Sequence, residues 1–435
     1  MLEHPPIATE QEELDSFKLA FTPEIQRTNS EYPYWDKVKY MPVKDGLSSK
    51  SLWFALKFLR QLCRTVVNFG KYRFSFMVTD EMFELLHYFD MNIGGNLTGE
   101  HIIPSENKNT YLVSSIMEEA IASSQMEGAA TTRKVAKDML RKSERPRNKG
   151  QQMILNNYLT INHIKEIAKA DFSIRQLLEI HRSMTVNTLD DEADAGKIRE
   201  HDHILVMDGF TGDIAHMPPH YEELTGLLAD LEKFFNRDGK NFIHPIVKGI
   251  IVHFILAFLH PFIDGNGRTA RSLFYWYMIR NNYWLIEYMS ISRIIYKEKK
   301  KYEKAFLYTE YDDNDLTYFI LYNLRVMKKS FEELKLYLKR KTEENSSILL
   351  LANIKGINQR QAQILKIMNE KANICLSVKE IENRFSVSNF TARADLEGLV
   401  KSGYLTEIQL NKVKRNYIKS EIFDSMIRNK IKKTY

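Results

Sequence analysis

The chain has little cysteine for its size. Its 435 residues include only two cysteines, Cys63 and Cys375, which lie far apart in the sequence. This count excludes a disulfide framework and a zinc site built from cysteines, and it is typical of a reducing compartment. We therefore predict a cytoplasmic protein.

Long hydrophobic segments are also missing. The most apolar stretch, 246–260, is too short to cross a membrane and is interrupted by Lys248 and His253. The N-terminal segment is acidic and has no apolar core, so we do not expect a secretory signal peptide. These features predict a protein without membrane contact, in which 246–260 forms a buried core helix.

An excess of one charge is absent from most of the chain and appears only at its C-terminal end. The formal net charge is +6, but residues 341–435 alone contain 17 basic and 10 acidic residues, so the remainder is nearly neutral. Such asymmetry indicates an anionic partner such as nucleic acid for the C-terminal part. A basic face that only contacts solvent is the alternative.

Hydrophobic periodicity predicts a mainly α fold. Apolar residues recur at three- and four-residue spacing over 50–67, 79–91 and 109–128, and through most of 149–337. The segment 200–219 interrupts this pattern with a Gly-Phe-Thr-Gly turn, and it predicts a short β-hairpin.

The C-terminal part has a different pattern. Helical segments are predicted at 357–371, 377–385 and 388–403, followed by alternating apolar and polar residues over 404–420. Three helices followed by a two-stranded ribbon resemble a winged helix-turn-helix domain.

The segment HPFIDGNGRTAR, at 260–271, is the strongest local signal. The predicted core helix ends at its start, and a new helix begins after Gly265, Asn266 and Gly267. Glycines at a helix N-terminus allow backbone N–H groups to close on a ligand, and the helix dipole favours an anion there. This arrangement predicts a phosphate-binding loop.

Charged side chains around the loop extend that prediction. Arg268 and Arg271 are three residues apart, so they share a helix face and can hold neighbouring phosphates. Asp264 can hold Mg²⁺ against those phosphates, and His260 is placed to act as a general base. The alternative, a structural loop with surface arginines, does not explain why all these residue types occur together.

The segment resembles, position for position, the signature H-P-F-x-[D/E]-G-N-G-R-x-x-R of Fic-domain proteins. That resemblance implies an α-helical fold that mostly transfers AMP from ATP to a hydroxyl side chain of a target protein. It implies that His260 deprotonates the Ser, Thr or Tyr hydroxyl, and that Asp264 binds Mg²⁺ (or Mn²⁺). The backbone of 265–267 would form the anion hole, Arg268 would contact the phosphates, and Arg271 would meet the γ-phosphate.

The hairpin at 200–219 lies where that family has a flap that pairs with the target's backbone as an added strand. Met217 is the flap residue that we expect to contact the target. The preceding segment 196–200, GKIRE, is also similar to the family, although an ordinary basic turn is the alternative.

A second motif lies upstream of the loop. Ser123, Glu127 and Gly128 match the family's inhibitory pattern [S/T]-x-x-x-E-[G/N]. The resemblance implies that Glu127 pairs with Arg271 and keeps ATP in an unproductive pose, while Ser123 holds the helix near the loop. Glu127 could instead position water for the removal of AMP from a modified protein.

In a winged helix, the third helix enters the DNA major groove and the wing follows the phosphates. The alternative use of such a domain is protein contact or dimerisation. The candidate DNA contacts are Ser388, Thr391, Arg393, Lys412, Lys414 and Arg415.

The sequence thus predicts a helical Fic-like core with a β-hairpin flap and a C-terminal winged-helix domain. The predicted regions are an extension (1–108), an inhibitory helix with linker (109–148), the catalytic core (149–338) and the winged-helix region (339–435). The predicted function is autoinhibited AMP transfer. The alternatives are a DNA-binding regulator whose Fic domain senses a nucleotide, and a partner-binding module. The identity of the target and a homodimeric state stay open.

Overall fold

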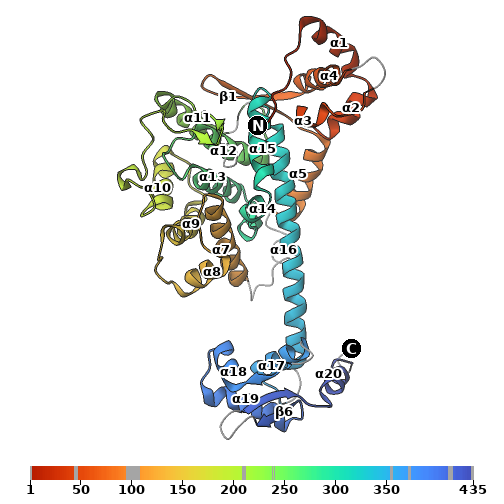
Figure 1. The fold of residues 1–435 in the computed structure, drawn as a ribbon, viewed down its shortest axis with the longest axis vertical. Coiled ribbons are helices and arrows are strands. Elements are labelled where there is room, and N and C mark those ends of the chain that lie inside the picture. The colour runs from red at the N-terminus through yellow and green to blue at the C-terminus, as the bar shows by residue number, and fades with distance from the viewer. Residues whose placement is uncertain are drawn as a thin grey trace. The chain divides into compact units, whose positions relative to one another are not determined.

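The structure is a computed structural model that describes residues 2–43, 48–94, 108–207, 212–237, 239, 241–352, 356–370, 374–409 and 415–432. The chain divides into two compact units, Met1–Leu334 and Lys335–Tyr435. Both are mainly helical, and the described strands form three small antiparallel sheets (Figure 1). The predicted mainly α fold is confirmed. The finer division into four regions stays a prediction.

The N-terminal elements contain a hairpin where the periodicity predicts only a helix. The helix predicted over 50–67 ends at Leu62, and β1 begins at Arg64. The β-branched run after Arg64 favours a strand, and Gly70, with φ of +53°, fits the first position of a two-residue hairpin turn. The elements are α1 (Glu10–Ala20), α2 (Pro23–Ser30), α3 (Trp35–Val38), α4 (Ser49–Leu62), β1 (Arg64–Phe69), β2 (Tyr72–Met77) and α5 (Asp80–Asn92).

The rest of the first unit is a helical body around two buried helices. Nearly every side chain of α12 and α13 is buried, so the predicted core helix at 246–260 is confirmed. No described helix is long and apolar enough to span a bilayer. The helices are α7 (Lys108–Met126), α8 (Arg133–Lys142), α9 (Lys149–Ile167), α10 (Ile174–Thr185), α11 (Leu224–Asn236), α12 (Pro245–Leu259), α13 (Asn266–Arg280), α14 (Ile291–Lys297), α15 (Lys299–Tyr311) and α16 (Thr317–Ala352). The part of α16 after Leu334 belongs to the second unit. The short elements are η2 (Glu192–Asp194), β3 (Val206–Met207), β4 (Ile214–His216), η3 (Tyr221–Glu223) and η4 (Trp284–Tyr288).

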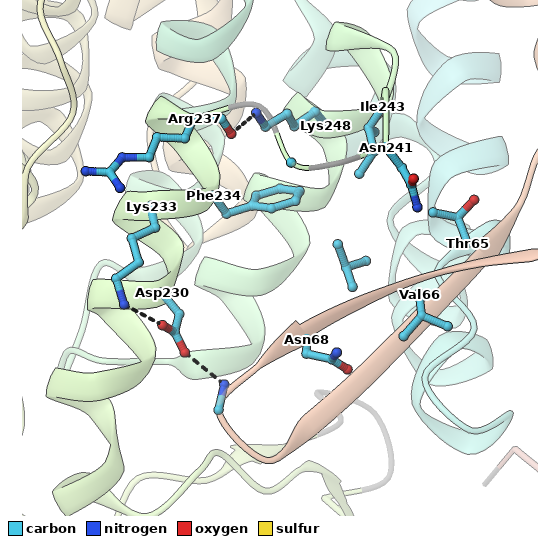
Figure 2. A pocket seen from close by; sticks show the side chains of 13 residues that line it. Thr65, Val66, Asn68, Asp230, Lys233, Phe234, Arg237, Asn241, Ile243 and Lys248 are labelled. Atoms are coloured by element: carbon cyan, nitrogen blue, oxygen red, sulfur yellow. Dashed lines mark hydrogen bonds and ion pairs between the residues drawn. The ribbon is translucent and has the colours of Figure 1, made fainter.

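The hairpin β1–β2 ties the N-terminal elements to this body. Phe74 packs edge to face against Phe254 and Phe258 of α12, with ring centroids 5.9 and 5.2 Å apart. At the turn, the Gly70 N–H donates to the Asp230 carboxylate at 3.0 Å, beside a cleft of about 530 Å³ between the hairpin and α11 (Figure 2). The N-terminal extension is therefore packed on the helix that ends at the phosphate-binding loop.

The C-terminal unit is a winged helix-turn-helix, as predicted. Ser377 and Ser388 cap the second and third helices through their side chains, and Gly403 ends the third with φ of +79°. The strands form one sheet in the order β5-β7-β6. The elements are α17 (Gln359–Glu370), β5 (Leu376–Ser377), α18 (Val378–Phe385), α19 (Asn389–Lys401), β6 (Leu405–Gln409), β7 (Arg415–Lys419) and α20 (Phe423–Lys432).

Candidate active site

The predicted phosphate-binding loop joins the two buried helices of the body. His260 caps the C-terminus of α12 in the left-handed region, with φ of +45°, and Gly265, with φ of +84°, caps the N-terminus of α13. The Asn266 amide accepts from the Phe262 N–H at 2.9 Å and donates to its carbonyl at 2.7 Å. This clamp fixes the loop, and the first N–H groups of α13 point out of the helix start, where an anion binds.

Two positions of the loop are closely approached by other side chains, and Gly265 also has a positive φ that favours glycine. A β-carbon at Gly265 would lie 2.7 Å from the Thr185 side chain, and one at Gly267 would lie 2.3 Å from the Glu127 carboxylate. The Glu127 side chain thus lies directly over the start of α13.

His181 supports the loop from α10, and the sequence alone did not identify it. Its ring stacks on Phe262 with centroids 3.7 Å apart. Its Nδ1 accepts from the Gly196 N–H at 3.0 Å, so its Nε2 carries the proton and donates to the Asp264 carbonyl at 2.8 Å. Burial lowers the pKa of His181 to about 4, which keeps this tautomer neutral. A single histidine on a helical face carries no local pattern that would have predicted this role.

Arg199 is a second support that was not predicted individually, although it lies in the GKIRE segment. Its backbone N–H donates to the Pro261 carbonyl at 2.9 Å, and its Nε donates to the His260 carbonyl at 3.0 Å. Its Nη2 donates to the Pro219 carbonyl after the flap. One buried arginine therefore connects the loop to the end of the flap.

His260 is set up as a neutral base. Its Nδ1 lies 3.3 Å from the Ala257 carbonyl, to which it can only donate, so the lone pair is on Nε2. Burial, assisted by the nearby His216, lowers the pKa of His260 to about 4. The ring is consequently neutral near pH 7 and able to take a proton.

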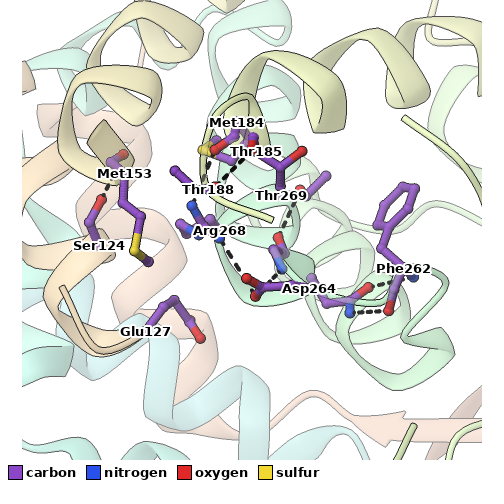
Figure 3. A network of polar contacts seen from close by, with 12 residues as sticks. Ser124, Glu127, Met153, Met184, Thr185, Thr188, Phe262, Asp264, Arg268 and Thr269 are labelled. Atoms are coloured by element: carbon purple, nitrogen blue, oxygen red, sulfur yellow. Dashed lines mark hydrogen bonds and ion pairs between the residues drawn. The ribbon is translucent and has the colours of Figure 1, made fainter. Parts of the chain in front are cut away.

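Arg268 is completely buried but only partly bonded (Figure 3). Its Nη1 donates to the Met184 carbonyl at 3.2 Å, and its Nη2 lies 3.6 Å from the Asp264 carboxylate. Among the described residues, its Nε and Nη2 have no hydrogen-bond partner. Burial lowers the pKa of this guanidinium. Buried charges are normally fully bonded, so Arg268 has donors prepared for an anion.

Arg271, one turn later, is held by the predicted inhibitory helix. Its Nε donates to the Ser123 hydroxyl at 2.9 Å, and its Nη2 donates to the Ser123 carbonyl at 2.9 Å and to the Glu127 carboxylate at 2.8 Å. Burial acts to raise the pKa of Glu127, but the charge and hydrogen bond of Arg271 outweigh it, and the pKa lies below its usual value. The predicted pair between Glu127 and Arg271 is thus present.

Other contacts hold α7, the predicted inhibitory helix, in place. The Lys299 ammonium donates to the Met126 carbonyl at its C-terminus at 3.2 Å. The buried Glu119 carboxylate accepts from the Ser292 N–H at 2.9 Å. Gly128 then leaves the helix with φ of +90°.

The predicted hairpin flap is present as the antiparallel pair β3 and β4, and residues 208–211 at its tip lie outside the described residues. At its end, His216 lies 2.7 Å from the Phe258 carbonyl through Nε2 and 2.7 Å from the Glu310 carboxylate through Nδ1. Met217 follows with 69% of its surface exposed, so it is available to a partner.

The donor set around Asp264 fits Mg²⁺ better than a structural metal. The Asp264 side chain is 48% exposed next to the loop, and the described residues contain no group of three potential protein ligands. Mg²⁺ usually keeps several waters and is held by one or two carboxylates together with substrate phosphates. A single half-exposed carboxylate beside an anion site satisfies that requirement.

The candidate DNA contacts of the C-terminal unit fall into three groups. The Ser388 and Thr391 hydroxyls are 2.9 Å apart and serve the N-cap of α19, while Arg393 is exposed on that helix. Arg415 pairs with Glu407 across the wing at 3.1 Å. Lys412 and Lys414 lie outside the described residues.

Comparisons with known proteins agree with the helical body that holds the loop and with the C-terminal unit. The model of the Fic/DOC family matches residues 171–278, and the model of the DeoR-like helix-turn-helix domain matches residues 360–409. Protein adenylyltransferase Fic of Drosophila yakuba is 31% identical over 117 residues, and that of Drosophila melanogaster is 30% identical over 117 residues. Each match covers 27% of this chain and 22% of the fly protein, so the chain spans about a fifth of these relatives' length.

Two solved structures share the fold. A Fic family protein from Desulfovibrio desulfuricans G20 gives a TM-score of 0.50 at 17% identity, covering 79% of this chain and 97% of that chain. A Fic-1 structure from C. elegans gives 0.50 at 17% identity, covering 79% and 89%. The motif, the geometry of its loop and these relatives lead to one conclusion: the chain contains a Fic domain and a C-terminal DeoR-like helix-turn-helix domain.

Proposed function

We propose that the protein is an autoinhibited protein adenylyltransferase, which transfers AMP from ATP to a Ser, Thr or Tyr hydroxyl of a target protein or of itself. The observation that carries the proposal is Arg268, a buried cation at the start of α13 with donors that no described residue satisfies. The adenylyltransferase names of the fly relatives support it at the level of the family.

In the proposed reaction, His260 Nε2 takes the proton of the target hydroxyl. The hydroxyl oxygen forms a bond to the α-phosphorus of ATP, and the bond from that phosphorus to the bridging oxygen breaks, so pyrophosphate leaves. The backbone of Gly265, Asn266 and Gly267 and the guanidinium of Arg268 stabilise the phosphate charge. Asp264 would hold Mg²⁺ (or Mn²⁺), which neutralises phosphate charge when bound.

We further propose that α7 inhibits this reaction. Arg271 is the predicted partner of the γ-phosphate, and its donors are already bound to Ser123 and Glu127. ATP has to compete with this ion pair, so it would bind without the contact that aligns the α-phosphorus. Glu127→Gly removes the competing carboxylate.

The test uses ATP labelled at the α- or the γ-phosphate with the Glu127→Gly protein and Mg²⁺. We expect α-label on protein, no γ-label, and an added AMP in the mass spectrum. Introducing His260→Ala into that background should lower incorporation roughly 10²–10⁴-fold, the usual contribution of a general base. Label from the γ-phosphate would mean phosphate transfer and contradict the proposal. If instead only the unmutated chain released AMP from a modified protein, the reaction would run in the direction of AMP removal.

For the C-terminal unit we propose DNA binding. Phe390 is 82% exposed and Arg393 is exposed on α19, the helix that enters the major groove in this fold. The expected result is an electrophoretic shift of genomic DNA fragments that weakens steeply with salt and is reduced by Arg393→Ala. If Arg393 contacts only phosphates, Arg393→Ala should weaken the binding of all fragments equally and leave the preference among them unchanged. If no shift is seen at low salt, the domain serves protein contact or dimerisation instead.

A further inference from the structure

A basic hollow of about 480 Å³ lies on the side of the hairpin β1–β2 that faces the turn between α15 and α16. Arg64, Lys71 and Arg73 supply its cations, and Asp313 supplies a carboxylate. Its other lining groups are mainly polar. We call this site the basic hollow. It differs from the cleft in Figure 2, which lies between the same hairpin and α11.

The charges of the basic hollow are only partly balanced within the protein. Lys71 pairs with Glu223 at 2.7 Å, and Asp313 pairs with Lys57 at 3.4 Å. In the part of the chain that the structure describes, Arg64 and Arg73 form no ion pair. Two guanidinium groups therefore remain available to a ligand.

The basic hollow also lies next to the flap. Its Tyr72 packs edge to face on Phe258 with centroids 5.4 Å apart, and the carbonyl of Phe258 contacts His216 at the end of β4. Lys71 binds Glu223, which belongs to the short η3 helix that follows the flap. A polypeptide bound along the flap would therefore continue toward the basic hollow.

We propose that the basic hollow binds an acidic segment of the target protein, next to the residue that receives AMP. This inference rests on the proposed function, because it concerns the substrate of that reaction. Guanidinium groups bind carboxylates through paired hydrogen bonds, so two of them recognise two acidic side chains of an extended segment. Nucleic acid is the less suitable occupant, because it needs many cations, and residues 1–340 carry no basic excess.

The probe is a fluorescein-labelled peptide with one tyrosine and six glutamates, compared with a peptide of the same length in which glutamine replaces glutamate. Binding to the full chain is followed by fluorescence polarisation. Arg64→Glu/Arg73→Glu should weaken binding of the acidic peptide by about tenfold or more, because the charge attraction becomes repulsion. Arg64→Gln/Arg73→Gln should give a smaller loss, and it serves as the check if the charge reversal disturbs folding.

The control is Lys134→Glu/Arg141→Glu on α8, which changes the net charge equally with two exposed residues. It should leave peptide binding nearly unchanged. The proposal would be overturned if Arg64→Glu/Arg73→Glu and the control lost peptide binding equally, or if neither lost it. It would also be overturned if a single-stranded oligonucleotide bound more tightly than the acidic peptide and depended in the same way on Arg64 and Arg73. Transfer is assayed in the Glu127→Gly protein with ATP and Mg²⁺, where binding of the peptide without AMP transfer to its tyrosine would contradict the proposed function and leave this site standing.

Discussion

Two arginines on the first turns of α13 differ in the hydrogen bonds that the protein gives them. Arg268 and Arg271 are both buried, yet Arg271 donates to Ser123 and Glu127, whereas Arg268 donates, among the described residues, one hydrogen bond to the Met184 carbonyl. Burial disfavours the charged form of both guanidinium groups and so acts to lower both pKa values. At Arg271 the charge of Glu127 outweighs the effect of burial, and the pKa of the guanidinium rises. At Arg268 burial outweighs the charges of Asp264 and Glu127, and the pKa falls.

Under the proposed function, this difference lets one loop be both prepared for ATP and inhibited. The site around Arg268 is assembled by α10, α12 and α13, and the Nε and Nη2 donors of Arg268 have no hydrogen-bond partner among the described residues. The site around Arg271 is completed by α7, which supplies the anion itself. In the proposed function, inhibition therefore needs no distortion of the loop at 260–271.

The largest effect is expected from removing Arg268. In the Glu127→Gly background, Arg268→Gln should lower the initial rate of AMP transfer by roughly 10²–10³-fold, because a fixed buried donor to the phosphates is lost. Labelled ATP measures the rate. Arg175→Gln, at an exposed position on α10, is the control and should not change it. A normal rate in Arg268→Gln would mean that the unsatisfied donors do not serve the nucleotide.

Stability should respond to the two arginines in opposite ways. Arg271→Met leaves Glu127 without its partner, and breaking a buried ion pair costs about 3–5 kcal/mol, with the lower end expected for the partly exposed Glu127. Arg268→Met removes a buried charge with few bonds, so it should be neutral or stabilising. Thermal unfolding of the intact chain checks both, and parallel losses would contradict the difference between the two sites.

The sequence predicts the parts of this site that are contiguous. The loop at 260–271 and the Glu127 motif have fixed spacing, so their residues were identified before their contacts were known. His181 and Arg199 act through contacts with residues far away in sequence, and neither has a local pattern. The same limit applies to β1, where helical periodicity continues into a strand. That strand pairs with β2, whose Phe74 packs on the distant Phe254 and Phe258 of α12.

The pH dependence of AMP transfer reports on His260 alone of these groups, because Arg268 and Arg271 stay charged over the acidic range. Burial lowers the pKa of His260 to about 4, so transfer by Glu127→Gly should change little from pH 7 to about pH 5 and fall in more acidic buffer. His216→Gln should move this acid limb to higher pH, because His216 helps to lower the pKa of His260. An acid limb near 6.5, the ordinary pKa of a histidine, in the Glu127→Gly protein would contradict a buried neutral base.

The smallest effect should come from Ser123. Its hydroxyl accepts from Arg271 Nε, but its backbone carbonyl also accepts from Arg271, and that contact survives in Ser123→Ala. One hydrogen bond is worth about 0.5–1.5 kcal/mol, so transfer should rise by roughly 2–10-fold, less than in Glu127→Gly. Ser124→Ala is the matched control, because the Ser124 hydroxyl donates to the Met153 carbonyl and does not contact Arg271. If Ser123→Ala activated as strongly as Glu127→Gly, the position of α7 and not the charge of Glu127 would hold Arg271 away from the nucleotide.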